Sequence, residues 1–188
     1  MLDDLALGSL AARSVAGDRR ALEELLRELE PAVVRVARLV VGPGSPAAED
    51  AAQEALLELT RSIGALRDPS SVRAWALRVS SRRALKVARR ERLLLRRSAG
   101  PLPRELAPLE SAGVREELRA AFYALPPRMR AVAVLRLYAG ASEREAAAAL
   151  GCTEGTVKSQ LHEARTRLAR SLRAAGVGTT AIERSAGR

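Results

Sequence analysis

Apolar side chains recur every three or four positions along most of this chain, which is the spacing of amphipathic helices. The first such block covers about residues 17–41 and carries Leu and Val at this spacing. It ends at Gly42-Pro43-Gly44, after which Ser45 and Pro46 suit the cap and first turn of a second helix over about 46–63. A third helix is expected over 72–97. Strand-like alternation is almost absent, so the pattern predicts an all-α fold.

Proline divides this helical pattern into two parts. Residues 98–113 contain Pro101, Pro103 and Pro108, and we expect them to form a flexible linker that can span up to roughly 50 Å. The expected organisation is two small helical domains, at 1–97 and 114–175, with a flexible tail over 176–188. A length of 188 residues with 47% apolar side chains can support both cores.

Residues 140–172 have the pattern of a helix-turn-helix, in which the start of the second helix contacts bases in the major groove. Ser142 and Glu145 have the spacing of a capping box, Gly151 permits a tight turn, and Thr153 is a suitable cap for the second helix. A plain helical hairpin in an Ala-rich protein is the alternative. The candidates for DNA contact are Thr156, Lys158, Ser159, Gln160, His162 and Arg165.

The charge of the chain favours a polyanionic partner, since the formal net charge is +10. Residues 1–60 hold six basic and eleven acidic side chains, whereas residues 61–100 hold twelve basic and two acidic ones. On the third helix the basic side chains form a stripe that could follow a phosphate backbone. A solvated basic face and a membrane-surface helix are the alternatives, but the apolar face of this helix is needed for the core. The stripe consists of Arg78, Arg82, Lys86 and Arg89.

Several other classes of site have little support. The single Cys152 and the single His162 make no credible zinc set, and Cys152 is expected to pack in the core. We expect no cofactor and no enzymatic activity, because the chain lacks a phosphate-binding glycine loop and paired carboxylates. It also lacks an apolar run long enough for a bilayer and the features of a signal peptide, so a cytoplasmic location is expected.

Five motifs in a fixed order resemble those of the extracytoplasmic-function (ECF) sigma factors, which belong to the sigma-70 family. The resemblance covers about residues 10–172, including a linker at the place where the family has one. The motifs are Gly17–Ala21, Ala48–Glu54, Trp75–Val79, Leu125–Arg130 and Gly155–His162.

This resemblance implies a specificity subunit that brings core RNA polymerase to promoters and assists DNA melting, without catalysis of its own. The implied partners are core RNA polymerase, through its beta-prime clamp helices and beta flap, promoter DNA and an anti-sigma factor. No insertion into a membrane is implied. The alternative is a helix-turn-helix regulator that binds duplex DNA without acting as a polymerase subunit.

Residue roles follow from the same resemblance. It implies that Asp50, Gln53 and Glu54 dock on the clamp helices, for which a solvated acidic face is the alternative. The loop at 66–71 would capture a flipped base of the minus-10 element, the basic stripe would line the melted strand, and the C-terminal domain would read the minus-35 element. The loop residues concerned are Arg67, Asp68, Ser70 and Ser71.

The chain departs from the family pattern at several of these places. Arg82 stands where Asn is usual and Lys86 where Asp is common, while Ala55 and Thr60 replace aromatic residues. In the reading helix, Gln160 and Glu163 replace common arginines. Because Gln prefers adenine and Glu accepts from cytosine, we expect an atypical promoter sequence.

Overall fold

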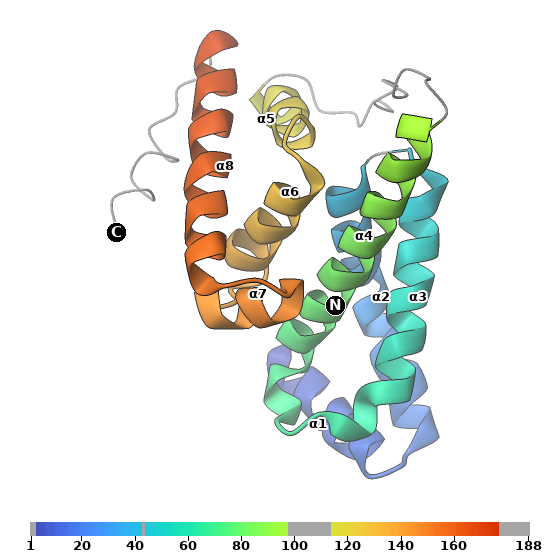
Figure 1. The fold of residues 1–188 in the computed structure, drawn as a ribbon. Helices are drawn as coiled ribbons and strands as arrows, with labels where there is room; N and C mark the ends of the chain where they lie inside the picture. Colours follow the sequence, from blue (N-terminus) through green and yellow to red (C-terminus); the bar gives the residue numbers. More distant parts are fainter. Residues whose placement is uncertain (1–2, 43, 98–113, 177–188) are drawn as a thin grey trace.

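The computed structural model describes residues 3–42, 44–97 and 114–176, and these residues form helices and no strands (Figure 1). The predicted all-α fold is therefore confirmed, and the proposed linker and nearly all of the proposed tail lie outside the described residues. The N-terminal region consists of α1 (Asp4–Val15), α2 (Arg19–Val41), α3 (Pro46–Ser62), η1 (Ile63–Ala65), η2 (Pro69–Ser71) and α4 (Val72–Arg97). The C-terminal region consists of α5 (Val114–Tyr123), α6 (Pro127–Ala133), η3 (Val134–Tyr138), α7 (Glu143–Leu150) and α8 (Glu154–Ala174).

Helix α1 is an element that the sequence analysis missed. Asp3 caps it, since one carboxylate oxygen accepts a hydrogen bond from the Ala6 amide at 2.8 Å. Leu7, Leu10 and Ala11 are buried, and the helix packs against α2 and η2. Its apolar stripe is only a few residues long, which is why the periodicity did not reveal it. Helix α1 therefore supports the loop that leads into α4.

The start of α3 differs in one detail from the expectation. Ser45 does occupy the N-cap position and Pro46 the first turn, but the Ser45 side chain makes no capping hydrogen bond. Its hydroxyl donates instead to a carboxylate oxygen of Glu91 on α4, at 2.8 Å. This contact joins the start of α3 to a residue 46 positions away, so Ser45 serves tertiary packing rather than the cap.

Helix α4 lies between the rest of the N-terminal region and the C-terminal region, with α2 and α3 on one side and α6 and α7 on the other (Figure 1). The two regions share one apolar core, in which Val36 and Val40 of α2 belong to the same buried cluster as Val132 and Leu135. A smaller cluster lies between α5 and α8. The sequence predicted both regions but not that they pack against each other.

A buried arginine completes this contact. Arg130 on α6 is only 6% exposed, and its guanidinium donates to the carbonyl oxygens of Val40 and Val41 at the end of α2, at 2.7 to 3.0 Å. It also donates to the carbonyls of Tyr123 and Leu125, at 2.9 and 3.0 Å. The last carbonyls of a helix have no partner within the helix, so Arg130 satisfies the C-terminal end of α2.

Candidate nucleic-acid interface

The acidic face of α3 is built as the sequence predicted. Asp50, Gln53 and Glu54 are three and four positions apart, so they share one face, and all three are exposed. The opposite face of α3 packs in the core through Ala51, Ala52, Ala55 and Leu59. Glu54 also lies 3.7 Å from Arg83 of α4 while remaining 48% exposed, so this contact contributes little to stability. The face is thus available to a partner.

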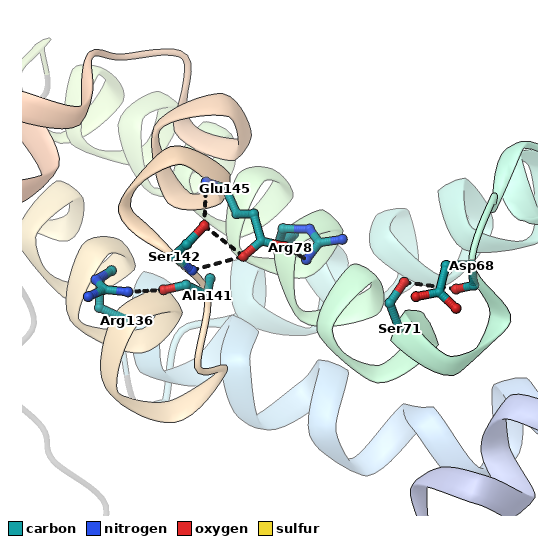
Figure 2. A network of polar contacts seen from close by, with 7 residues as sticks. All are labelled: Asp68, Ser71, Arg78, Arg136, Ala141, Ser142 and Glu145. Atoms are coloured by element: carbon teal, nitrogen blue, oxygen red, sulfur yellow. Dashed lines mark hydrogen bonds and ion pairs between the residues drawn. The ribbon is translucent and has the colours of Figure 1, made fainter.

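The loop before α4 is held by Asp68 (Figure 2). One carboxylate oxygen of Asp68 accepts hydrogen bonds from the amide of Ser70 at 3.0 Å and from its hydroxyl at 2.6 Å. The Ser71 hydroxyl donates to the carbonyl of Asp68 at 2.8 Å. These contacts shape the turn from within, whereas Arg67 is an exposed side chain beside it. Of the four predicted loop residues, Arg67 is the one most open to a ligand.

The basic stripe of α4 is present, but its members differ in their surroundings. Arg78 is half-buried, with its side chain 22% exposed, and pairs with Glu145 of α7 at 2.9 Å (Figure 2). Arg82 is exposed and pairs with Glu58 of α3. Lys86 and Arg89 are exposed. The predicted stripe therefore runs from a side chain engaged by the C-terminal region to side chains open to solvent.

The helix-turn-helix has the predicted geometry. Ser142 and Glu145 form a complete capping box, with the Ser142 amide donating to Glu145 at 2.8 Å and the Glu145 amide donating to the Ser142 hydroxyl at 3.2 Å (Figure 2). Hydrogen bonding from Ser142 holds the pKa of the Glu145 carboxyl below its usual value. Gly151 adopts the left-handed conformation at φ 61°, which suits glycine at this turn. Thr153 caps α8 by accepting from the Thr156 amide at 3.2 Å.

The six predicted reading residues fall into two groups on α8. Lys158, Ser159 and His162 are exposed, whereas the others are half-buried. The Thr156 hydroxyl is within hydrogen-bond distance of that of Thr153, at 2.9 Å. The side-chain oxygen of Gln160 is buried and has no hydrogen-bond partner among the described residues. The half-buried residues are Thr156, Gln160 and Arg165.

A groove of about 470 Å³ separates the basic stripe from the end of α7. The sequence did not reveal it, because its two walls are some sixty residues apart in the chain. Leu85 and Leu150 contribute apolar surface to it. Three of the four stripe residues line it, namely Arg82, Lys86 and Arg89.

Two further classes of site receive no support within the described part of the chain. No three His, Cys, Asp or Glu side chains there are placed to hold a metal ion together. None of its helices combines the length and apolar character needed to cross a bilayer. The candidate binding sites among the described residues are thus charged and polar surfaces on helices.

Comparison with known proteins identifies the family of the chain. Residues 12–93 match the family model of sigma-70 region 2, and residues 115–168 match that of sigma-70 region 4. The ECF RNA polymerase sigma factor SigM of Mycobacterium tuberculosis is 35% identical over 87% of this chain and 83% of its own length. SigD of Mycobacterium bovis, also named an ECF RNA polymerase sigma factor, is 33% identical over 90% of this chain and 85% of its own length.

Two solved structures have a similar fold. The sigma factor RpoE of Bartonella quintana, in complex with the anti-sigma factor NepR, has a TM-score of 0.66 at 23% identity, over 80% of this chain and 96% of its own. CnrH, in complex with the cytosolic domain of CnrY, has a TM-score of 0.58 at 26% identity, over 90% of this chain and 98% of its own. Both sigma-70 regions, in the order seen here, and the identity to SigM and SigD establish that the chain belongs to the ECF RNA polymerase sigma factors, which direct core polymerase to promoters.

Proposed function

We propose that three surfaces of this sigma factor have separate roles in transcription initiation. The acidic face of α3 docks on the clamp helices of the beta-prime subunit, the loop at 66–71 and the stripe of α4 hold the minus-10 strand, and the start of α8 reads the minus-35 element. The observation that carries this assignment is the exposure of Asp50, Gln53 and Glu54 on one face and of Lys158, Ser159 and His162 on another, within one chain. Electrostatics supports each role, since polymerase docking uses the acidic region and DNA contact uses the basic one.

The proposed function also specifies further partners of the chain and assigns it no catalytic activity. The flap of the polymerase beta subunit is a second contact, and the chain acts in the cytoplasm without catalysis of its own. An anti-sigma factor is a further proposed partner, which is supported by the fold shared with RpoE, a sigma factor in complex with the anti-sigma factor NepR. Carboxylates on an exposed helix and arginines on another offer such a partner both signs of charge.

Run-off transcription tests the proposal most directly. The purified chain, added to core polymerase and a promoter selected with it, is expected to yield a run-off transcript. A regulator that binds duplex DNA without polymerase would yield none. If the amount of run-off transcript is the same with and without the chain, the sigma role of these surfaces is refuted.

The only tryptophan of the chain reports on the minus-10 loop. Trp75 is half-buried against the core, one turn after Ser71. We expect that single-stranded minus-10 DNA, added with core polymerase, shifts the emission of 7-azatryptophan placed at position 75, because the strand passes beside the loop. Labelling this chain alone keeps the tryptophans of polymerase out of the signal. Arg67→Ala should suppress the shift, whereas Arg61→Ala, an exposed control at the end of α3, should not. A shift that survives Arg67→Ala would contradict the placement of the strand.

A further inference from the structure

Helix α8 carries a carboxylate on the side that faces away from the helices it packs against. It contacts α5, α6 and α7, which lie together beside it (Figure 1). Five buried side chains of α8 mark its inward side, namely Val157, Leu161, Ala164, Leu168 and Leu172. At about 100° per residue, Glu163 lies on the opposite side, together with Ser159 and Thr166. Its side chain is 45% exposed, so Glu163 shares the outward face of α8 with the predicted reading residue Ser159.

Arg167 fixes the position of this carboxylate. Its Nε donates a hydrogen bond to Oε1 of Glu163, which lies four positions earlier on the same helix, at 2.7 Å. This hydrogen bond holds the pKa of the Glu163 carboxyl below its usual value, so the group is ionised at neutral pH. An ionised carboxylate donates no hydrogen bond, and its two oxygens together can accept about four. The bond to Arg167 therefore leaves Oε2 able to accept from a group outside the chain.

Helix stability gives this acidic residue little reason to stand where it does. Exposed ion pairs at this spacing stabilise a helix only slightly. Glu154, the other acidic residue of α8, lies in the first turn, where the helix dipole favours a negative charge. Glu163 lies in the middle of the helix, beyond the reach of that effect. Its place on a face that meets DNA is better explained by a contact with a base.

A carboxylate in the major groove is compatible only with a base that offers it a hydrogen-bond donor. Phosphates repel it, and so do the acceptor atoms of guanine and thymine. The donors in this groove are the exocyclic amines of cytosine and adenine. Adenine presents its N7 acceptor beside the amine, which matches a side-chain amide, whereas a carboxylate has no donor to offer N7. Cytosine is therefore the base that fits ionised Glu163.

We propose that Glu163 is a specificity-determining residue for the minus-35 element, which accepts a hydrogen bond from the exocyclic amine of one cytosine, and that Arg167 is a positioning residue that orients its carboxylate. This inference rests on the proposed function, since it names a base read by the helix assigned there. Glu163 lies about 6 Å further along the helix axis than Ser159, so it meets a different base pair. Arg167 also compensates part of the negative charge that Glu163 brings near the phosphates.

Selection from promoter DNA randomised across the minus-35 element tests the base contact. The full chain is used, once with core polymerase and once alone on duplex DNA. The unchanged chain should select cytosine over adenine at one position by about fivefold or more. Glu163→Gln should select adenine at that same position, because the amide supplies the missing donor, and should leave the other positions unchanged. Glu163→Ala should favour neither base there.

A second pair of variants tests the positioning role. Arg167→Met should lower the ratio of cytosine to adenine at that position, although Glu163 is still present. Arg170→Met is the matched control, with the same change of charge at an exposed position of α8. It should weaken binding to all sequences alike and leave the ratio unchanged. Thermal melting followed by circular dichroism checks the fold, since a purely stabilising ion pair would change the melting temperature but not the base ratio.

The outcomes separate this inference from the proposed function. If Glu163→Gln selects the same bases as the unchanged chain, the base contact is overturned, even when run-off transcription succeeds. If Arg167→Met keeps the base ratio while Glu163→Gln changes it, the positioning role is overturned. If the unchanged chain selects no sequence in either format, the reading role of α8 is refuted together with the inference. Failure of run-off transcription by a chain that selects cytosine would refute the sigma role and leave the base contact in place.

Discussion

Reversing Asp50 and Glu54 to Lys is expected to abolish binding of the chain to core polymerase while its helical content stays the same. Both side chains are exposed on one face of α3, and the core packing of that helix uses its other face. Like charges placed against a complementary partner cost several kcal/mol, so affinity should fall by about a hundredfold or more. Among the described residues, the double reversal removes the contact of Glu54 with Arg83, and exposed pairs of this kind contribute about 0–1 kcal/mol. Sedimentation or gel filtration with core polymerase measures the effect.

A matched control is available on α2. Glu23 and Glu24 are exposed, and their double reversal to Lys changes the net charge by the same amount. That variant should retain binding, because the effect expected at α3 depends on position rather than on total charge. If the reversal of Asp50 and Glu54 leaves binding intact, the acidic face of α3 is merely solvated and the dock lies elsewhere.

The second large effect is expected at the reading helix. Gln160→Ala should change the bases preferred at one position of the minus-35 element, at a cost of about 1–3 kcal/mol for the preferred base. The side-chain oxygen of Gln160 is buried without a partner in the free chain. Its removal should therefore leave the thermal stability unchanged or raise it, since an unsatisfied buried group is unfavourable. Loss of discrimination without loss of stability would separate a reading role from a packing role.

Selection of minus-35 sequences from a random pool measures this effect. Lys158→Ala is the comparison, because an exposed lysine that contacts phosphate should weaken binding to all sequences by a similar factor. Equal losses on preferred and scrambled DNA for Gln160→Ala would remove this residue from the reading set.

Local chemistry explains which features the sequence could predict. The capping box, the turn at Gly151 and the cap at Thr153 each depend on residues three or four positions apart, and all three are present. The boundaries of α2, α3 and α4 agree with the periodicity within about two residues, as expected for long amphipathic helices. The fold class and the positions of the predicted surfaces on their helices followed from this local information.

The local sequence pattern could not predict contacts between residues that are far apart in the chain. Arg130 meets a carbonyl 90 residues earlier in the chain, and Arg78 meets a carboxylate 67 residues later. Nothing in a 3.6-residue period specifies such partners, and Arg130 stands in a motif that was notable only as part of a family resemblance. Helix α1 was not predicted for a related reason, since its few buried residues are buried by contacts with α2 and η2, which are not adjacent to them in the helical pattern.

The shared apolar core also makes the two regions dependent on each other for folding. Helix α6 packs against α2 within this core, and Arg130 binds the carbonyls of Val40 and Val41. A fragment that ends at α4 would therefore expose to water the apolar surface that α6 covers and these two carbonyls. Such a surface favours self-association, because two copies of the fragment can bury their exposed apolar patches against each other. Expressing the N-terminal region alone would therefore change its solubility as well as its length.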